Sequence, residues 1–120
     1  MIEDRYAGKE RTVLLSKAFK EFFDGLGSQE QNNIEYVIDL IIDHKLIHTS
    51  FVKKLIDTEF YEMRVKIGYN EYRTIVFSVD HDNIIEATKV YLLNGFLKKS
   101  TKDYKKQINR SKTILEELKL

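Results

Sequence analysis

Two arginines and a pair of lysines are the residues of this sequence with the clearest potential for chemistry. Arg64 lies in a run in which apolar and charged residues alternate, and Arg73 lies at the start of the next strand-forming run. Lys98 and Lys99 follow Gly95, at the end of a third such run. A planar guanidinium group can bind two phosphate oxygens at once, and a lysine ammonium adds a localised positive charge. This set therefore predicts a binding site for a phosphate group.

The three runs must lie side by side for these cations to converge. By parity, Arg64 leaves its strand on the same face as Glu62 and Lys66, opposite an apolar face made of Tyr61, Met63 and Val65. Adjacent strands lie about 4.8 Å apart, so the two arginines and the lysine pair could line one concave site. Each group also has an interpretation without a substrate. Arg64 could form surface ion pairs with its neighbours, and Lys98 and Lys99 could flank a helix.

The periodicity of the sequence predicts a strand, two helices, three strands and a final helix. Ser16 is expected to cap the first helix, which Gly25 and Gly27 end, and Ser28 with Gln31 is expected to form a capping box on the second. After residue 60 the period changes from helical to two, which is typical of strands with one buried face. The expected elements cover residues 12–15, 16–26, 28–42, 60–67, 72–79, 84–93 and 100–118.

This order of elements predicts an α+β fold in one domain, residues 1–120. We expect an antiparallel sheet, formed by a short N-terminal strand and a three-strand meander. The two N-terminal helices should form an antiparallel pair packed on this sheet, and a basic helix should end the chain. All helices are expected on one face of the sheet.

Composition excludes several classes of protein. With 42% hydrophobic residues the chain should fold, and with no cysteine it has neither disulfides nor thiolate metal sites. A zinc site would depend on carboxylates, because there are three histidines, of which His44 and His48 are expected to be structural. The sequence has neither an apolar run of membrane-spanning length nor a secretory signal, so the cytoplasm is the expected location and no membrane partner is expected.

The near-neutral net charge of +1 conceals a basic segment. Residues 89–112 contain eight lysines or arginines and one acid, which leaves 12 basic and 18 acidic residues in the remainder of the chain. Such a division favours a surface that meets a polyanion, most commonly nucleic acid. A solvated basic helix is the alternative, and a nucleic-acid-binding module without toxicity is the corresponding minimal function.

Three segments carry a pattern whose order and spacing are more specific than its parts. They are Phe60 to Arg64 (FYEMR), Tyr72 to Phe77 (YRTIVF) and Val90 to Thr101 (VYLLNGFLKKST). The pattern resembles that of the RelE/ParE toxin superfamily, in particular its phage-derived, HigB-like branch. That branch has aromatic-Glu-hydrophobic-Arg, then an Arg-led strand, then Leu-His-Gly-Phe-x-Lys-Lys-Thr. The resemblance spans residues 51–110, and the helix pair before it fits in order and length.

The resemblance implies the toxin of a type II toxin–antitoxin system, with a RelE-like fold. Such a toxin is usually a ribosome-dependent mRNA endoribonuclease that inhibits translation and uses no metal or cofactor. The implied partners are the ribosome, mRNA and an antitoxin, usually a helix-turn-helix protein encoded beside the toxin. The ribose 2′-hydroxyl attacks the neighbouring phosphate, which requires in-line positioning, proton transfer and stabilisation of developing charge.

The family motif also implies roles for particular residues. Three implied catalytic residues hold the phosphate or neutralise its charge, and four implied RNA-binding residues surround them. The catalytic residues are Arg64, Arg73 and Lys99. The RNA-binding residues are Lys54, Phe96, Lys98 and Lys102.

One position departs from the family pattern. Asn94 stands where the family commonly has histidine, and an amide cannot act as a titrating base. The role of base would then pass to Tyr91, Tyr104 or a lysine. Two alternatives follow: a toxin of the same fold that binds a protein target such as DNA gyrase, or a catalytically inactive relative that only binds its antitoxin.

Overall fold

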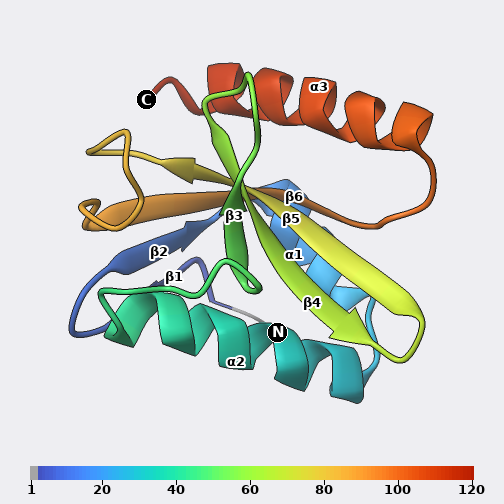
Figure 1. Cartoon of the computed structure of the whole chain (residues 1–120), viewed down its shortest axis with the longest axis horizontal. Helices are drawn as coiled ribbons and strands as arrows, with labels where there is room; N and C mark the ends of the chain where they lie inside the picture. The colour runs from blue at the N-terminus through green and yellow to red at the C-terminus, as the bar shows by residue number, and fades with distance from the viewer. Residues whose placement is uncertain (1–2) are drawn as a thin grey trace.

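The fold is built around a central sheet. We describe a computed structural model in which residues 3–120 are placed, and in this range six strands form one sheet in the order β1-β2-β6-β5-β4-β3 (Figure 1). Strand β2 pairs with β6 in parallel, and the other neighbours are antiparallel. The strands are β1 (Arg5–Ala7), β2 (Thr12–Leu15), β3 (Val52–Lys54), β4 (Phe60–Ile67), β5 (Asn70–Ser78) and β6 (Lys89–Leu97).

The expected three-strand meander is confirmed as β4, β5 and β6. Strand β4 covers the predicted residues, and its buried Met63 and Val65 alternate with Arg64 and Lys66. A two-residue turn joins β4 to β5, and Gly68 within it has φ +61, a left-handed conformation that glycine adopts without steric cost. Strands β1 and β3 were not predicted, because three residues are too few to show a periodicity.

The last strand begins five residues later than expected, at Lys89 instead of Ile84. The backbone N–H of Ile85 donates to Asn83 Oδ1, and that of Glu86 donates to the Asn83 carbonyl, both at 3.0 Å. These bonds form a turn that keeps Ile84 buried without pairing it in the sheet. The apolar residues of this segment therefore belong to a packed loop, which an apolar pattern alone cannot distinguish from a strand.

Helices α1 (Lys17–Asp24) and α2 (Ser28–Asp43) follow β2. Ser16 caps α1 as expected, because its hydroxyl accepts from the backbone N–H of Phe19. The capping-box prediction for α2 is wrong. Gly27 is the N-cap, Ser28 is already helical, and the Gln31 amide donates to the Phe23 carbonyl at 2.9 Å. Because the connection between the helices is short, the Phe23 carbonyl at the end of α1 lies within reach of the Gln31 side chain. Gln31 therefore bonds to α1 and does not form a capping box with Ser28.

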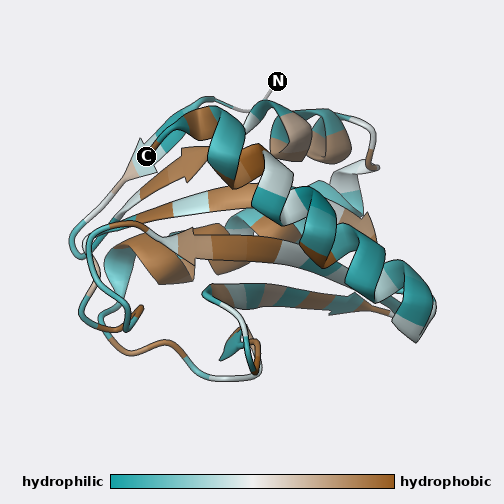
Figure 2. Cartoon of the chain, turned by 90° about the horizontal axis from the view of Figure 1, so that it is seen from above, coloured by the Kyte–Doolittle hydropathy of each residue, from teal (hydrophilic) through white to brown (hydrophobic). Residues whose placement is uncertain are grey.

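The helices cover both faces of the sheet, which corrects the expectation of a single covered face. Helix α1 packs on β6 and α2 packs on β2 and β4, and the apolar faces of these two helices belong to one core cluster on the same face of the sheet (Figure 1). Helix α3 (Thr101–Leu118) crosses the opposite face and presents a hydrophilic side to solvent (Figure 2). The second layer exists because the central strands are apolar on both faces, with Val76 under α2 and Ile75 under α3.

A bulge in β6 adapts this strand to its two helices. The register with β5 shifts between Thr74 and Val76, which places Leu93 and Asn94 together on the α3 face. Next to the bulge, Gly95 lies so close to α1 that a Cβ at this position would approach the Phe22 ring to 2.2 Å. Close contact between α1 and β6 thus requires glycine here.

A buried arginine joins the end of α2 to the loop before β6. Arg11 is 2% exposed, and its guanidinium donates to five backbone carbonyls at 2.7–3.1 Å. Burial lowers the pKa of this group from its ordinary value. The carbonyls belong to Ile41, His44, Lys45, Ile84 and Ile85.

We expect Arg11→Met to lower the free energy of unfolding by about 2–3 kcal/mol, because several buried carbonyls lose their donor. Urea unfolding of the purified protein measures this change. Arg5 on edge strand β1 is exposed, and Arg5→Met should shift stability by less than about 0.5 kcal/mol. Equal effects of the two substitutions would contradict a structural role for Arg11.

Candidate functional site

The sheet register places the predicted arginines next to each other. Arg64 of β4 pairs with Arg73 of β5, and Arg73 pairs with Phe96 of β6. One step nearer the turn, Lys66 pairs with Glu71, whose carbonyl accepts from the backbone N–H of Lys98 at 2.8 Å. Residues in register across neighbouring strands share a face. These two rows therefore lie on the α3 face, at the end of the sheet where β6 leads into α3.

A buried carboxylate holds the two arginines together. Glu62 has 0% exposure, and its Oε1 accepts from Nε of Arg64 at 2.8 Å and from Nη1 of Arg73. Arg73 is almost as buried as Glu62, whereas one third of the Arg64 side chain is exposed. Within residues 3–120, Glu62 Oε2 is a buried oxygen without a hydrogen-bond partner. Glu62 thus fixes both guanidinium groups through one atom.

A second carboxylate lies on the outer side of Arg73. Glu71 Oε1 accepts from Nη2 of Arg73 at 2.7 Å, and 44% of the Glu71 side chain is exposed. The hydrogen bond from Arg73 and the charge of its guanidinium lower the pKa of Glu71. The nearby ammonium groups of Lys98 and Lys66 lower it further. Glu71 is therefore an anion at neutral pH, in contact with the cations predicted to bind phosphate.

The site differs from the purely cationic hollow expected from the sequence. Arg64 and Arg73 do converge, but both are ion-paired, and the exposed Lys66 lies in the neighbouring row, where its charge acts on Glu71. The signal for the acids was in the sequence, because Glu62 and Glu71 have the parity of the arginines. Four cations and two carboxylates leave two net positive charges in this cluster, which we call the arginine cluster (Arg64, Arg73, Lys66, Lys98, Glu62 and Glu71).

A comparison with protein families finds a match over most of the chain. The family described as "Phage derived protein Gp49-like (DUF891)" matches residues 21–116, which include α2, the whole meander and most of α3. This chain belongs to the Gp49-like family of phage-derived proteins. The family is toxin-like and related to toxins of the RelE and HigB type. No curated protein and no solved structure matches the chain.

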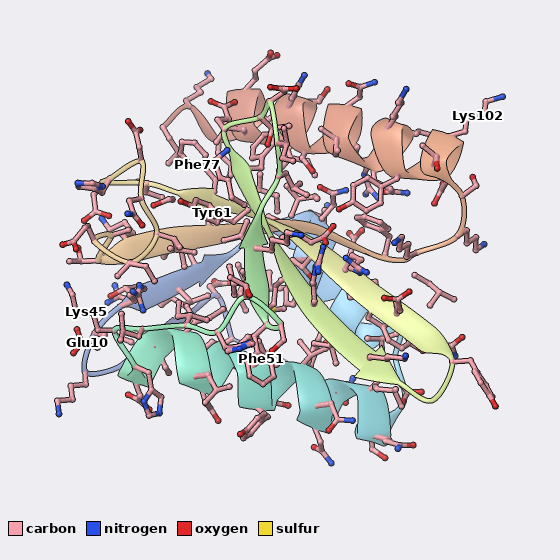
Figure 3. All side chains as sticks on the ribbon, in the orientation of Figure 1. Glu10, Lys45, Phe51, Tyr61, Phe77 and Lys102 are labelled. Carbon is pink, nitrogen blue, oxygen red and sulfur yellow. The ribbon has the colours of Figure 1, made fainter. Side chains whose placement is uncertain are left out.

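Three further predicted residues of the Gp49-like chain lie where β6 leads into α3. Phe96 is buried, with its ring edge-on to that of Tyr104 at 5.7 Å. Lys99 is exposed in the connection to α3. Lys102 is in the first turn of α3 and points away from the sheet (Figure 3).

Lys54 lies apart from these residues. Its ammonium donates to the carbonyls of Leu55 and Thr58 and lies 5.6 Å from the centre of the Tyr61 ring. Tyr61 belongs to the face of β4 opposite Arg64, and its hydroxyl donates to the Asp82 carbonyl. The structure thus brings Arg64, Arg73 and Lys98 together and leaves Lys54 at the end of β3, where it pairs with Tyr61 near the other end of β4.

Asn94 is an anchor for α3. It is fully buried, and its amide donates to the carbonyl and to the side-chain oxygen of Gln107 at 3.1 and 3.0 Å. The hydroxyl of Ser111, also fully buried, donates to Asn94 Oδ1. In this Gp49-like chain, Asn94 therefore anchors α3 to β6 through hydrogen bonds with Gln107 and Ser111.

The two tyrosines considered as substitutes for the family histidine lie in different places. Tyr91 pairs with Phe77, five residues before Phe96 in β6 and about 16 Å from the row of Arg73. Tyr104 projects from α3 against Phe96, which is in that row. Tyr104 is therefore the tyrosine near the arginine cluster.

Two general properties complete the description of the site. Among the helices of residues 3–120, none has the length and apolar character needed to cross a membrane. The same range contains no group of three or more acidic or histidine side chains arranged to hold a metal ion.

We expect Glu71→Gln to tighten binding of single-stranded RNA several-fold at neutral pH, because it removes the anion that occupies Arg73. As pH falls through the lowered pKa of Glu71, its ion pair with Arg73 is lost, so wild type and variant should converge in acid. Fluorescence anisotropy with a labelled RNA measures both effects. Glu86, paired with Lys45 at 3.5 Å, provides the matched control Glu86→Gln, which should leave affinity unchanged.

Proposed function

We propose that this Gp49-like protein is the toxin of a type II toxin–antitoxin system, and that it acts as a ribosome-dependent mRNA endoribonuclease without a metal. The observation that carries the proposal is the register of Arg64 and Arg73 on one face of the sheet, with Lys66 and Lys98 in the neighbouring row. A pair of guanidinium groups with excess positive charge suits a phosphodiester whose charge increases during cleavage. The family relationship supports the same proposal.

In the proposed reaction the 2′-oxygen of a ribose forms a bond to the adjacent phosphorus while its proton leaves to a base. The bond from phosphorus to the 5′-oxygen of the next nucleotide breaks, and that oxygen takes up a proton. The products are a 2′,3′-cyclic phosphate and a 5′-hydroxyl. Arg73 and Arg64 would stabilise the charge on the pentacoordinate phosphorus, with Lys99 as an additional cation.

The remaining residues would hold the RNA or move protons. Lys98 and Lys102 follow the path from the arginine cluster to α3 and would contact the RNA backbone. Tyr104 is the proposed proton-transfer group, since Asn94 is committed to α3. An antitoxin, encoded beside the toxin and usually of the helix-turn-helix class, would neutralise the protein by covering the arginine cluster.

The proposal is tested by mapping the 5′ ends of cellular transcripts after induced expression in bacteria. It predicts growth arrest and discrete cuts within translated codons, and the cuts should disappear from a reporter transcript whose start codon is removed. Cuts that persist without translation would contradict ribosome dependence. Defects in DNA supercoiling without transcript cuts would contradict the nuclease proposal and support a toxin that acts on DNA gyrase.

A second candidate function is that of an inactive relative that only binds its antitoxin. It is favoured by Asn94, which cannot titrate, and by the ion pairs that occupy both arginines. This candidate predicts normal growth on expression without the antitoxin, together with stable complex formation when the neighbouring gene is co-expressed. Arrest of growth by the wild type, relieved by Arg73→Ala, would rule it out.

A further inference from the structure

A surface groove lies at the edge of the sheet where α2 passes β3 and β4. Its lining includes the polar residues Asn33 and Ser50, and the cationic residues Arg64 and Lys66 of β4 border it at the sheet edge. Two aromatic side chains, Tyr36 and Phe51, complete the lining together with Val37 and Val65. Phe51 lies between the sheet edge and α2 (Figure 3).

The aromatic pair in this groove is only partly buried in the protein core. Tyr36 is 58% exposed, and its ring meets that of Phe51 edge-on, with centroids 6.5 Å apart. The buried stripe of α2, which includes Ile34, Val37 and Ile38, faces the sheet, so Tyr36 is not needed to cover it. Proteins bind unpaired nucleotides by stacking the bases on exposed aromatic rings while nearby cations meet the phosphates, and here Arg64 and Lys66 lie on the strand that borders the groove.

Arg64 connects this groove to the arginine cluster. Its Nε donates to Glu62 on the α3 side of the sheet, and the same residue borders the groove on the α2 side. The backbone N–H of Arg64 donates to the Phe51 carbonyl at 2.7 Å, which fixes the aromatic loop against the same residue. A strand of RNA with one phosphate on the arginine cluster therefore has an aromatic surface within reach of a neighbouring base.

We infer that the groove is a subsite for an unpaired nucleobase of the RNA substrate, next to the phosphodiester held by Arg64 and Arg73, with Tyr36 as its stacking platform. This inference rests on the proposed function, since it assigns a further part of the same substrate. The Asn33 amide can donate to and accept from the edge of a base. The Ser50 hydroxyl donates to His48 Nδ1 at 2.8 Å and can still accept from a base. Lys66, exposed on the α3 side of the same strand, would meet a phosphate adjacent to that base.

The absence of tryptophan in this chain allows a direct test of stacking. Tyr36→Trp keeps an aromatic platform and introduces a single tryptophan, whose selectively excited emission should be quenched when single-stranded RNA is added at low salt. Leu46, exposed in the segment after α2 and away from the arginine cluster, gives the control Leu46→Trp, which should show no quenching. Equal quenching in both proteins, or none in either, would overturn the inference.

Affinity measurements separate the base from the backbone. Tyr36→Ala should weaken binding of single-stranded RNA roughly tenfold, whereas Tyr36→Phe should bind like the wild type. Binding of an RNA with abasic sugars should be unaffected by Tyr36→Ala, because no base is left to stack. If Tyr36→Ala weakens both RNAs equally, or neither, the subsite is wrong.

The same series distinguishes failure of the subsite from failure of the proposed function. Loss of transcript cleavage with Arg73→Ala, combined with full binding by Tyr36→Ala, would refute the subsite and leave the nuclease proposal intact. Base-dependent binding through Tyr36 in a protein that cuts no transcript would keep the subsite as an RNA-binding feature and refute the nuclease.

Discussion

Replacing Arg73 with alanine is expected to slow cleavage of RNA by about a hundred- to a thousandfold, the effect of removing one preorganised donor from a developing oxyanion. Arg73 is the expected centre of the site because it is buried, fixed by Glu62 and Glu71, and in register with both Arg64 and Phe96. Cut fragments at the mapped codons, counted per unit of protein, measure the change. Relief of growth arrest should accompany it.

Two further variants make the Arg73 result interpretable. Arg73→Lys keeps one charge but loses paired donation, so it should recover only a minor part of the rate. Arg5→Ala removes an exposed arginine at the far edge of the sheet and should leave cleavage unchanged. Wild-type cleavage by Arg73→Ala, with a normal melting temperature, would remove Arg73 from the site.

Replacing Glu62 with alanine is expected to lower the free energy of unfolding by about 3–5 kcal/mol, because it leaves two guanidinium groups without their shared buried anion. The same change should reduce cleavage far more than RNA binding. It increases the positive charge of the cluster, but it frees Arg64 and Arg73 from the atom that orients them. Urea unfolding, RNA affinity and fragment yield give the three readouts.

Two controls accompany Glu62→Ala: a conservative substitution at the same position and removal of an exposed glutamate nearby. Glu62→Gln retains a carbonyl oxygen that can accept from the guanidinium groups but loses the negative charge, so it should fall between wild type and Glu62→Ala in stability. Glu59, exposed just before β4, supplies Glu59→Ala, which should change little. A Glu62→Ala protein that is as stable as the wild type would show that the ion pairs are incidental.

Local periodicity predicted the scaffold of the site but not its partners. Alternation in β4 correctly placed Arg64 opposite Met63 and Val65, and the meander brought Arg73 beside it. The same alternation suggested that Glu62 faces water, yet it is fully buried. Its burial comes from the rest of the fold, since α3 and the neighbouring strands cover that face.

Other differences have the same physical origin. Asn94 was read as a missing catalytic group, whereas a one-residue bulge turns it toward Gln107 and Ser111 of α3. The groove of Tyr36 and Phe51 joins a helix to a loop and a strand, so no local pattern could indicate it. Long-range packing, and not propensity, decides which polar residues are buried and which aromatic rings stay free.

The most direct test of the account is a structure of this protein on a translating ribosome whose A-site codon carries 2′-O-methyl groups that prevent cleavage. We predict a phosphodiester oxygen within hydrogen-bonding distance of the Arg73 guanidinium, with Arg64 beside it and the Glu71 carboxylate displaced. A bound complex in which the RNA lies along α3 or elsewhere, with Arg73 still paired to Glu71, would contradict the central claim.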